Sequence, residues 1–110
     1  FTLDEKAVLD FCKGYKKLGL GVPFVVNGHV QNFTEAMAAA LKDAGCLILK
    51  FGIESGSERI RRHVLRRPMS NERIARAFAM ANEAGLHTSA FLMIGLPLEE
   101  RSDIEATIDL

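Results

Sequence analysis

The sequence has no excess charge of either sign and no long hydrophobic run. Its 14 Lys and Arg residues are matched by 14 Asp and Glu residues, so the formal net charge is zero. A balanced charge argues against a general nucleic-acid or membrane-surface binder, because both functions need a basic surface. No apolar stretch approaches the ~20 residues that span a bilayer. We therefore expect no direct contact with nucleic acid or membrane.

Cysteine is scarce and irregularly placed. Cys12 and Cys46 lie 34 positions apart and form neither a CxxC nor a CxxxCxxC pattern. This spacing indicates no metal site and no disulfide framework, so we expect two buried core thiols in a cytoplasmic protein. The first residues lack the basic region of a signal peptide, so none is expected. The chain starts on Phe1 rather than methionine, so we expect a fragment of a longer protein.

The most informative stretch runs from Leu47 to Ser57. It is apolar as far as Ile53, then changes abruptly to Glu54 and small polar residues. A short continuous apolar run predicts a buried strand of a parallel sheet, with both faces covered. A carboxylate at the carboxyl end of such a strand stands where α/β enzymes contact their ligands. Gly56 has no side chain, so a ligand or a backbone can approach it closely.

The remaining sequence alternates helical and strand patterns. Three of the helical patterns end at a glycine that is followed by an apolar run, which predicts an α/β fold with three parallel strands in one small domain, residues 1–110. The first helix is expected to begin with a capping box formed by Thr2 and Glu5. The expected helices cover residues 2–18, 32–44, 70–84 and 101–110, and the expected strands cover residues 22–26, 47–53 and 87–94.

Parallel strands bring their carboxyl ends to one edge of the sheet, where a functional site is expected. The three exits are Asn27-Gly28-His29, Glu54-Ser55-Gly56 and Gly95-Leu96-Pro97. The polar segment 58–67 contains five arginines, which as a charge run predicts a solvated face. Glu99 is interpreted as a charge at the N-terminus of the last helix.

Two of these motifs resemble one enzyme family. The segment Phe51-Gly52-Ile53-Glu54-Ser55-Gly56-Ser57 resembles the fourth barrel strand of radical S-adenosylmethionine (SAM) enzymes, and Ile94-Gly95-Leu96-Pro97-Leu98-Glu99-Glu100 resembles the turn after their fifth strand. The chain is most similar to the cobalamin-binding and methylthiotransferase-like branches. The resemblance implies a partial TIM-type barrel, of which this chain is the part from the helix after strand two to the helix after strand five.

The resemblance also implies residue roles. Glu54 and Ser55 would contact bound SAM, Met93 would flank its adenine, and Gly95 would lie in the same site. Arg66, twelve residues after Glu54, stands where the family carries a cation for the methionine carboxylate of SAM. Asn27 and His29 are candidates on the substrate side. No catalytic or metal-ligating residue is expected in this chain.

In the family, a [4Fe-4S] cluster cleaves SAM reductively and yields a 5′-deoxyadenosyl radical that abstracts hydrogen from a substrate. The cluster is held by a CxxxCxxC motif after the first strand, which this chain lacks. The resemblance therefore implies a cluster held by residues outside the chain, a parent enzyme that uses SAM and, in the cobalamin-binding branch, also cobalamin, and a fragment that is inactive alone.

Two other interpretations remain open from the residues. The first is a (β/α)8-barrel enzyme that binds a phosphate ligand, with the polar loop after Glu54 holding the anion at a helix N-terminus. The second is a non-enzymatic assembly or regulatory domain. Three strands without neighbours expose unpaired edges, so we also expect this chain to self-associate.

Overall fold

Helices and strands alternate along the chain, as the sequence predicts. A computed structural model describes all residues, 1–110, and its strands form one parallel sheet in the order β1-β2-β3. The α/β fold with three parallel strands is thereby confirmed. The elements are α1 (Glu5–Leu18), β1 (Phe24–Gly28), the 3-10 helix η1 (Val30–Asn32), α2 (Glu35–Asp43), β2 (Cys46–Glu54), α3 (Glu58–His63), α4 (Asn71–Glu83), β3 (His87–Leu92) and α5 (Arg101–Asp109).

The start of α1 differs from the sequence prediction. Asp4, not Thr2, is the N-cap, and its carboxylate accepts a hydrogen bond from the Ala7 amide at 2.7 Å. Thr2 is fully buried, and its hydroxyl accepts a bond from the His29 amide at 2.7 Å. The capping-box prediction is wrong because Thr2 is used in a long-range contact with the end of β1, which the local spacing does not reveal.

Other helix ends follow the predicted pattern more closely. Gly19 closes α1 in the left-handed conformation with φ 60°, and the Ser70 hydroxyl caps α4 by accepting a bond from the Arg73 amide at 3.1 Å. The helix predicted over residues 32–44 begins only at Glu35, because Thr34 is its N-cap and a 3-10 turn precedes it.

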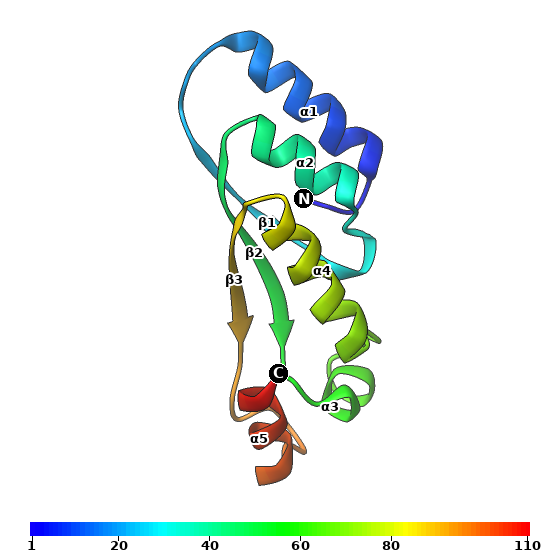
Figure 1. Cartoon of the computed structure of the whole chain (residues 1–110). Helices are drawn as coiled ribbons and strands as arrows, with labels where there is room; N and C mark the ends of the chain where they lie inside the picture. Colours follow the sequence, from blue (N-terminus) through cyan, green and yellow to red (C-terminus); the bar gives the residue numbers. More distant parts are fainter.

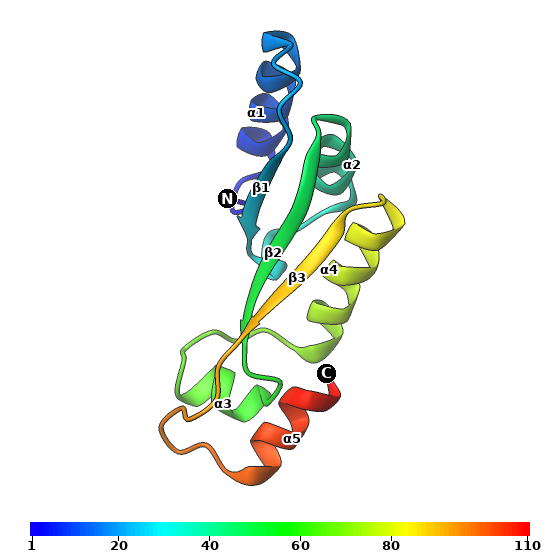
Figure 2. The same ribbon diagram turned by 90° about the vertical axis from the view of Figure 1, so that its left-hand side faces the viewer.

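The hydrophobic core lies on one face of the sheet. Leu49, Phe51 and Ile53 of β2 are buried at every second position, as expected for a strand with one covered face. Figure 1 shows α1, α2 and α4 on that side of the strands, and Figure 2 looks onto the other side, which no helix covers. The sequence prediction that β2 is covered on both faces is therefore wrong within this chain.

Both cysteines belong to this core. Cys12 and Cys46 are buried and unbonded to each other, as expected from the sequence. Burial raises the pKa of each thiol, because a thiolate would lose its hydration.

None of the helices has the length and apolar character that a membrane span needs.

The last helix, α5, packs beyond the carboxyl ends of the strands rather than along the sheet (Figure 2). It lies against the loop that follows β2, and a Cβ atom at Gly56 would collide with the backbone of Ala106 and Thr107. The close approach that the sequence suggested for Gly56 is therefore made by a helix backbone.

Replacing Gly56 with alanine is expected to destabilise the fold by about 2 kcal/mol or more, because backbone atoms cannot move aside as a flexible side chain can. Chemical denaturation measures the effect. Gly14→Ala is the matched control, since Gly14 lies exposed within α1 with nothing near its Cβ position, and it should be neutral or stabilising by up to about 1 kcal/mol. Equal unfolding midpoints for the two variants would contradict the packing of α5 on the loop.

Candidate functional site

The candidate site begins at the end of β2. Glu54 has a left-handed backbone with φ 69°, unusual for a residue with a side chain. Its carbonyl accepts a hydrogen bond from the Met93 amide at 2.7 Å, just beyond the last residue of β3. The structure thus brings Glu54 and Met93 side by side at the carboxyl edge of the sheet, as expected for parallel strands.

The Glu54 carboxylate turns back over the sheet. A Cβ atom at Gly52 would stand 2.7 Å from its Oε1 atom, so the missing side chain makes room for the carboxylate. Arg67 donates from Nη1 to the same oxygen at 2.9 Å, and both side chains are partly exposed, at 29% for Arg67 and 20% for Glu54. The carboxylate is therefore held in place by a partner but remains open to solvent.

Arg67 is a site residue that the sequence analysis missed. The arginine predicted from the sequence, Arg66, is exposed, has a left-handed backbone with φ 55° and forms no ion pair with Glu54, whose partner is Arg67. A weak signal was present in the sequence, because Pro68 biases the residue before it toward an extended backbone. That bias distinguishes Arg67 from its neighbour but does not say where its side chain goes.

The residues from Ser55 to Ser57, called the loop 55–57, are hydrogen-bonded to α5. The Gly56 amide donates to the Thr107 hydroxyl at 2.8 Å, and the Ser57 hydroxyl donates to Asp103 at 2.5 Å. Ser55 is completely buried and its hydroxyl accepts from the Ser57 amide at 3.2 Å. The Ser55 side chain thus shapes the loop and presents no surface of its own.

Asp103 is the acceptor on which this contact depends. It is buried, and its other oxygen pairs with Arg59 and accepts from the Glu100 amide at 2.9 Å. The hydrogen bond from Ser57, followed by the one from Arg59, lowers the pKa of Asp103 from 3.8 to about 2. The carboxylate is therefore ionised at any pH near neutrality.

A buried arginine supports the loop from the other side. Arg61 is fully buried and donates to the Ser55 carbonyl at 2.5 Å, to the Met69 carbonyl at 3.0 Å and to the Asn71 side chain. It thereby joins the residue after Glu54 to the segment that follows Arg66 and Arg67. The prediction that the arginines of segment 58–67 form a solvated face is wrong for Arg61, which is fully buried, and for Arg67, which is only partly exposed and paired with Glu54. Arg59 is exposed as predicted, although it is paired with Asp103.

The turn after β3 is ordered by Glu99. Its Oε2 atom accepts from the Gly95 amide at 2.6 Å and from the Leu96 amide at 3.2 Å. Glu99 directly precedes Glu100, the N-cap of α5, so its charge lies at the start of the helix as predicted, but its side chain orders the preceding turn. Above the turn, Phe91, Met93 and Ile94 are 49%, 40% and 70% exposed, so none belongs to the core.

The two remaining candidates lie at the end of β1. Asn27 pairs with Lys50 of β2, which precedes Gly52 by two residues and Glu54 by four. His29 follows β1, and its Nδ1 atom accepts from the Gln31 amide at 3.2 Å. Burial, and secondarily the charge of Arg67, lowers the pKa of His29 below 6.5, so the imidazole is mainly neutral at pH 7.

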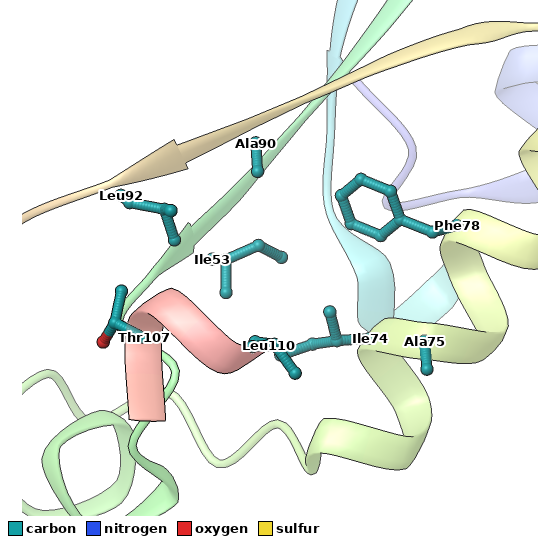
Figure 3. A pocket seen from close by; sticks show the side chains of 8 residues that line it. All are labelled: Ile53, Ile74, Ala75, Phe78, Ala90, Leu92, Thr107 and Leu110. Carbon is teal, nitrogen blue, oxygen red and sulfur yellow. The ribbon is translucent and has the colours of Figure 1, made fainter. Parts of the chain in front are cut away.

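A separate apolar cavity of about 260 Å³ lies between α4, α5 and the helix-covered face of the sheet (Figure 3). It contains none of the site residues predicted from the sequence, and it is lined by Ile53, Ile74, Ala75, Phe78, Ala90, Leu92, Thr107 and Leu110. No group of three His, Cys, Asp or Glu side chains in the chain is arranged to hold a metal ion.

This arrangement is that of part of a parallel α/β barrel with a candidate site at the carboxyl ends of its strands, and comparison with known proteins identifies the family. The model of the Radical SAM superfamily matches residues 2–110, so the chain belongs to the Radical SAM superfamily. The resemblance noted in the sequence is thereby confirmed.

Curated relatives include an uncharacterized methyltransferase of Pyrococcus horikoshii, 35% identical over 108 residues, and a cytidylyl-2-hydroxyethylphosphonate methyltransferase of Streptomyces wedmorensis, 24% identical over 96 residues. The alignments cover 98% and 87% of this chain but only 23% and 18% of those proteins. The chain thus spans about a quarter or less of the length of these relatives.

Solved structures share the fold. The cobalamin-dependent SAM radical enzyme OxsB superposes with a TM-score of 0.79 at 15% identity, over 96% of this chain and 16% of that one. The radical SAM methyltransferase TsrM from Kitasatospora setae gives 0.75 at 18% identity, over 96% of this chain and 21% of that one. These similarities confirm the partial barrel.

The low pKa of Asp103 predicts a pH-dependent stability. Because its pKa is lower in the folded chain, its contribution is complete above pH 3.8 and is lost as the pH falls toward 2. Urea unfolding across this range should show a steeper loss of stability in the unmodified chain than in Asp103→Asn, which should also be less stable at pH 7. Asp109→Asn, at an exposed position of α5, serves as control. If Asp103→Asn and Asp109→Asn have the same pH profile, Asp103 does not hold the loop.

Proposed function

We propose that this chain is part of the SAM-binding catalytic domain of a radical SAM enzyme, from the helix after barrel strand two to the helix after strand five. One observation carries the proposal: Glu54 places a partly exposed carboxylate at the carboxyl edge of the sheet, directly beside Met93. A ligand at this edge would contact the ends of β2 and β3 together, as ligands of parallel α/β folds commonly do.

The residues present suit the polar groups of SAM. The Glu54 carboxylate can accept hydrogen bonds from the methionine ammonium or from the ribose hydroxyls. The exposed side chain of Met93 offers an apolar surface for adenine, and Gly95 lies in the ordered turn just beyond it. Arg66 is exposed and belongs to none of the ion pairs, so it can pair with the methionine carboxylate through its two-pronged guanidinium. Ser55 contributes by holding the loop, since its own side chain is buried.

The iron–sulfur cluster belongs to residues outside this chain. The only two cysteines are buried in the core, so they do not supply the three thiolates of a CxxxCxxC motif. When bound, SAM and a reduced [4Fe-4S] cluster would supply the 5′-deoxyadenosyl radical. The role of this chain is to bind and orient SAM. The isolated chain is expected to be inactive.

The reaction that we propose for the whole protein is a methyl transfer that uses cobalamin. Both curated relatives are named as methyltransferases, and the two solved relatives are described with cobalamin bound. Free, buried thiols suit a cytoplasmic location, where disulfides are rare. The substrate side of the site would include Asn27 and His29, which end β1 at the same edge.

The phosphate-binding alternative is disfavoured by the hydrogen bonds of the loop 55–57. A loop that holds an anion must offer unbonded backbone amides. The Gly56 amide is bonded to Thr107 and the Ser57 amide to Ser55. The Gly56 and Ser57 amides therefore hold the loop in place and are not free to bind an anion.

Replacing Glu54 with glutamine tests the proposed SAM contact. In the intact protein with its cluster reconstituted, Glu54→Gln should weaken SAM binding about tenfold to a hundredfold, because a charged acceptor is lost. Anaerobic calorimetric titration measures the affinity. Glu83→Gln, at an exposed position at the end of α4 without internal contacts, should bind SAM as the unmodified protein does. Unchanged affinity in Glu54→Gln would refute the assignment.

We also propose that the chain self-associates when it is isolated. Both β1 and β3 are edge strands, and the uncovered face exposes apolar side chains such as Val25 and Phe91, which are 47% and 49% exposed. Light scattering of the 110-residue chain should show dimers or larger species that grow with concentration. A monomer across a wide range of concentration would contradict this.

A further inference from the structure

The uncovered face of the sheet carries a lysine near its centre. We define the open face by the residues that alternate with the buried ones: Lys50 and Gly52 of β2, their neighbours Ser89 and Phe91 of β3, and Asn27 of β1. Helices lie only on the opposite side (Figure 2). In a closed barrel the open face would point to the interior, where branched apolar side chains normally fill the space. A lysine there is unusual, because lysine is rarely buried without a partner.

Lys50 has no acidic partner in the chain. It takes part in none of the six ion pairs. Its Nζ atom lies 6.0 Å from the centre of the Phe91 ring. Phe91 pairs with Gly52, which is two residues closer to the carboxyl edge than Lys50. The ammonium group therefore lies over the side chain of the strand pair that is next nearer to the carboxyl edge.

A second cation lies at Gly52, and a third donor follows the end of the neighbouring strand β1. The Arg67 guanidinium lies over the backbone of Gly52, and its Nη1 atom is 3.4 Å from the position that a Cβ atom at Gly52 would take. His29 accepts from the Gln31 amide at Nδ1, so its neutral ring carries the proton on Nε2 and can donate from there. Two cations, Lys50 and Arg67, thus belong to the open face near Gly52, and His29 follows the neighbouring strand β1 with a neutral donor; Glu54 is the only carboxylate paired to any of them.

This excess of positive charge needs an anion. Glu54 neutralises one cation at most, and a lysine ammonium enclosed in a barrel without a counter-charge would be costly. A SAM ammonium bound at Glu54 would share the carboxylate with Arg67 and add a further positive charge. An oxyanion above Gly52 would pair with both cations and accept a hydrogen bond from Nε2 of His29.

We propose that Lys50, Arg67 and His29 form a subsite for an oxyanion of the second substrate, a carboxylate or a phosphate-type group, an inference that rests on the proposed SAM site at Glu54. The subsite places that anion on the open face, on the inward side of Glu54. The substrate is thereby held by its charged end, below the edge at which SAM binds. Asn27, in the same row as Lys50, marks the β1 side of the subsite.

The test uses the intact protein with its cluster and SAM bound, and it uses methylphosphonate and acetate as probes. Lys50→Met should weaken binding of the preferred probe at least about tenfold, whereas Lys50→Arg, which keeps the charge, should stay within about threefold. Lys13→Met is the matched control, because Lys13 is exposed on α1 without an ion pair. Acetamide, which is uncharged, should not bind. A preference for one probe identifies the group as phosphate-type or as carboxylate.

A second measurement does not depend on any variant. Acetic anhydride should acetylate Lys50 more slowly when the preferred probe is present, while the rate at Lys13 should not change, as followed by mass spectrometry. The inference is overturned if neither probe binds, if Lys50→Met binds them as the unmodified protein does, or if Lys50 is unreactive without a probe because a carboxylate from elsewhere in the protein already covers it. SAM affinity is measured in the same samples, so failure of the SAM site is distinguished from failure of the anion subsite.

Discussion

The direct contact between the backbone of α5 and Gly56 is the constraint on which the site depends. It lets the loop 55–57 donate from the Gly56 amide to Thr107 and from the Ser57 hydroxyl to Asp103. Any side chain at position 56 would push the helix away and leave these buried donors without partners. Because the loop starts at the residue after Glu54, a loop fixed in this way also fixes where the carboxylate leaves the sheet. The helix therefore acts on the site without touching a ligand.

Arg61 provides the second support of the same loop. A buried guanidinium is costly unless its donors are used, and Arg61 donates to Ser55, Met69 and Asn71. These partners lie on both sides of the segment that carries Arg66 and Arg67. One side chain thus sets the distance between the strand end that offers a carboxylate and the turn that offers cations. A site that binds a zwitterion needs this spacing to be fixed before the ligand arrives.

Much of the framework was predictable because it is encoded locally. The glycines that end the helices, the apolar run of β2 and the alternation of helical and strand patterns were enough to predict parallel strands. They also predicted that Glu54 and the turn at Gly95 lie on one edge of the sheet. The errors concern side chains whose partners are remote in sequence. Thr2 contacts His29, Arg61 contacts Ser55 and Met69, and Arg67 crosses back to Glu54. In each case a local rule, a capping box or a charge run, predicted exposure, whereas a contact across the fold determined the outcome.

A crystal structure of the intact protein with SAM bound tests the central claim most directly. The account predicts that the loop 55–57 keeps its contacts with α5, and that an oxygen of Glu54 lies within about 3 Å of the methionine ammonium or a ribose hydroxyl. It also predicts that Arg66 reaches the methionine carboxylate. SAM bound away from the ends of β2 and β3, or a Glu54 carboxylate still paired only with Arg67, would contradict the account.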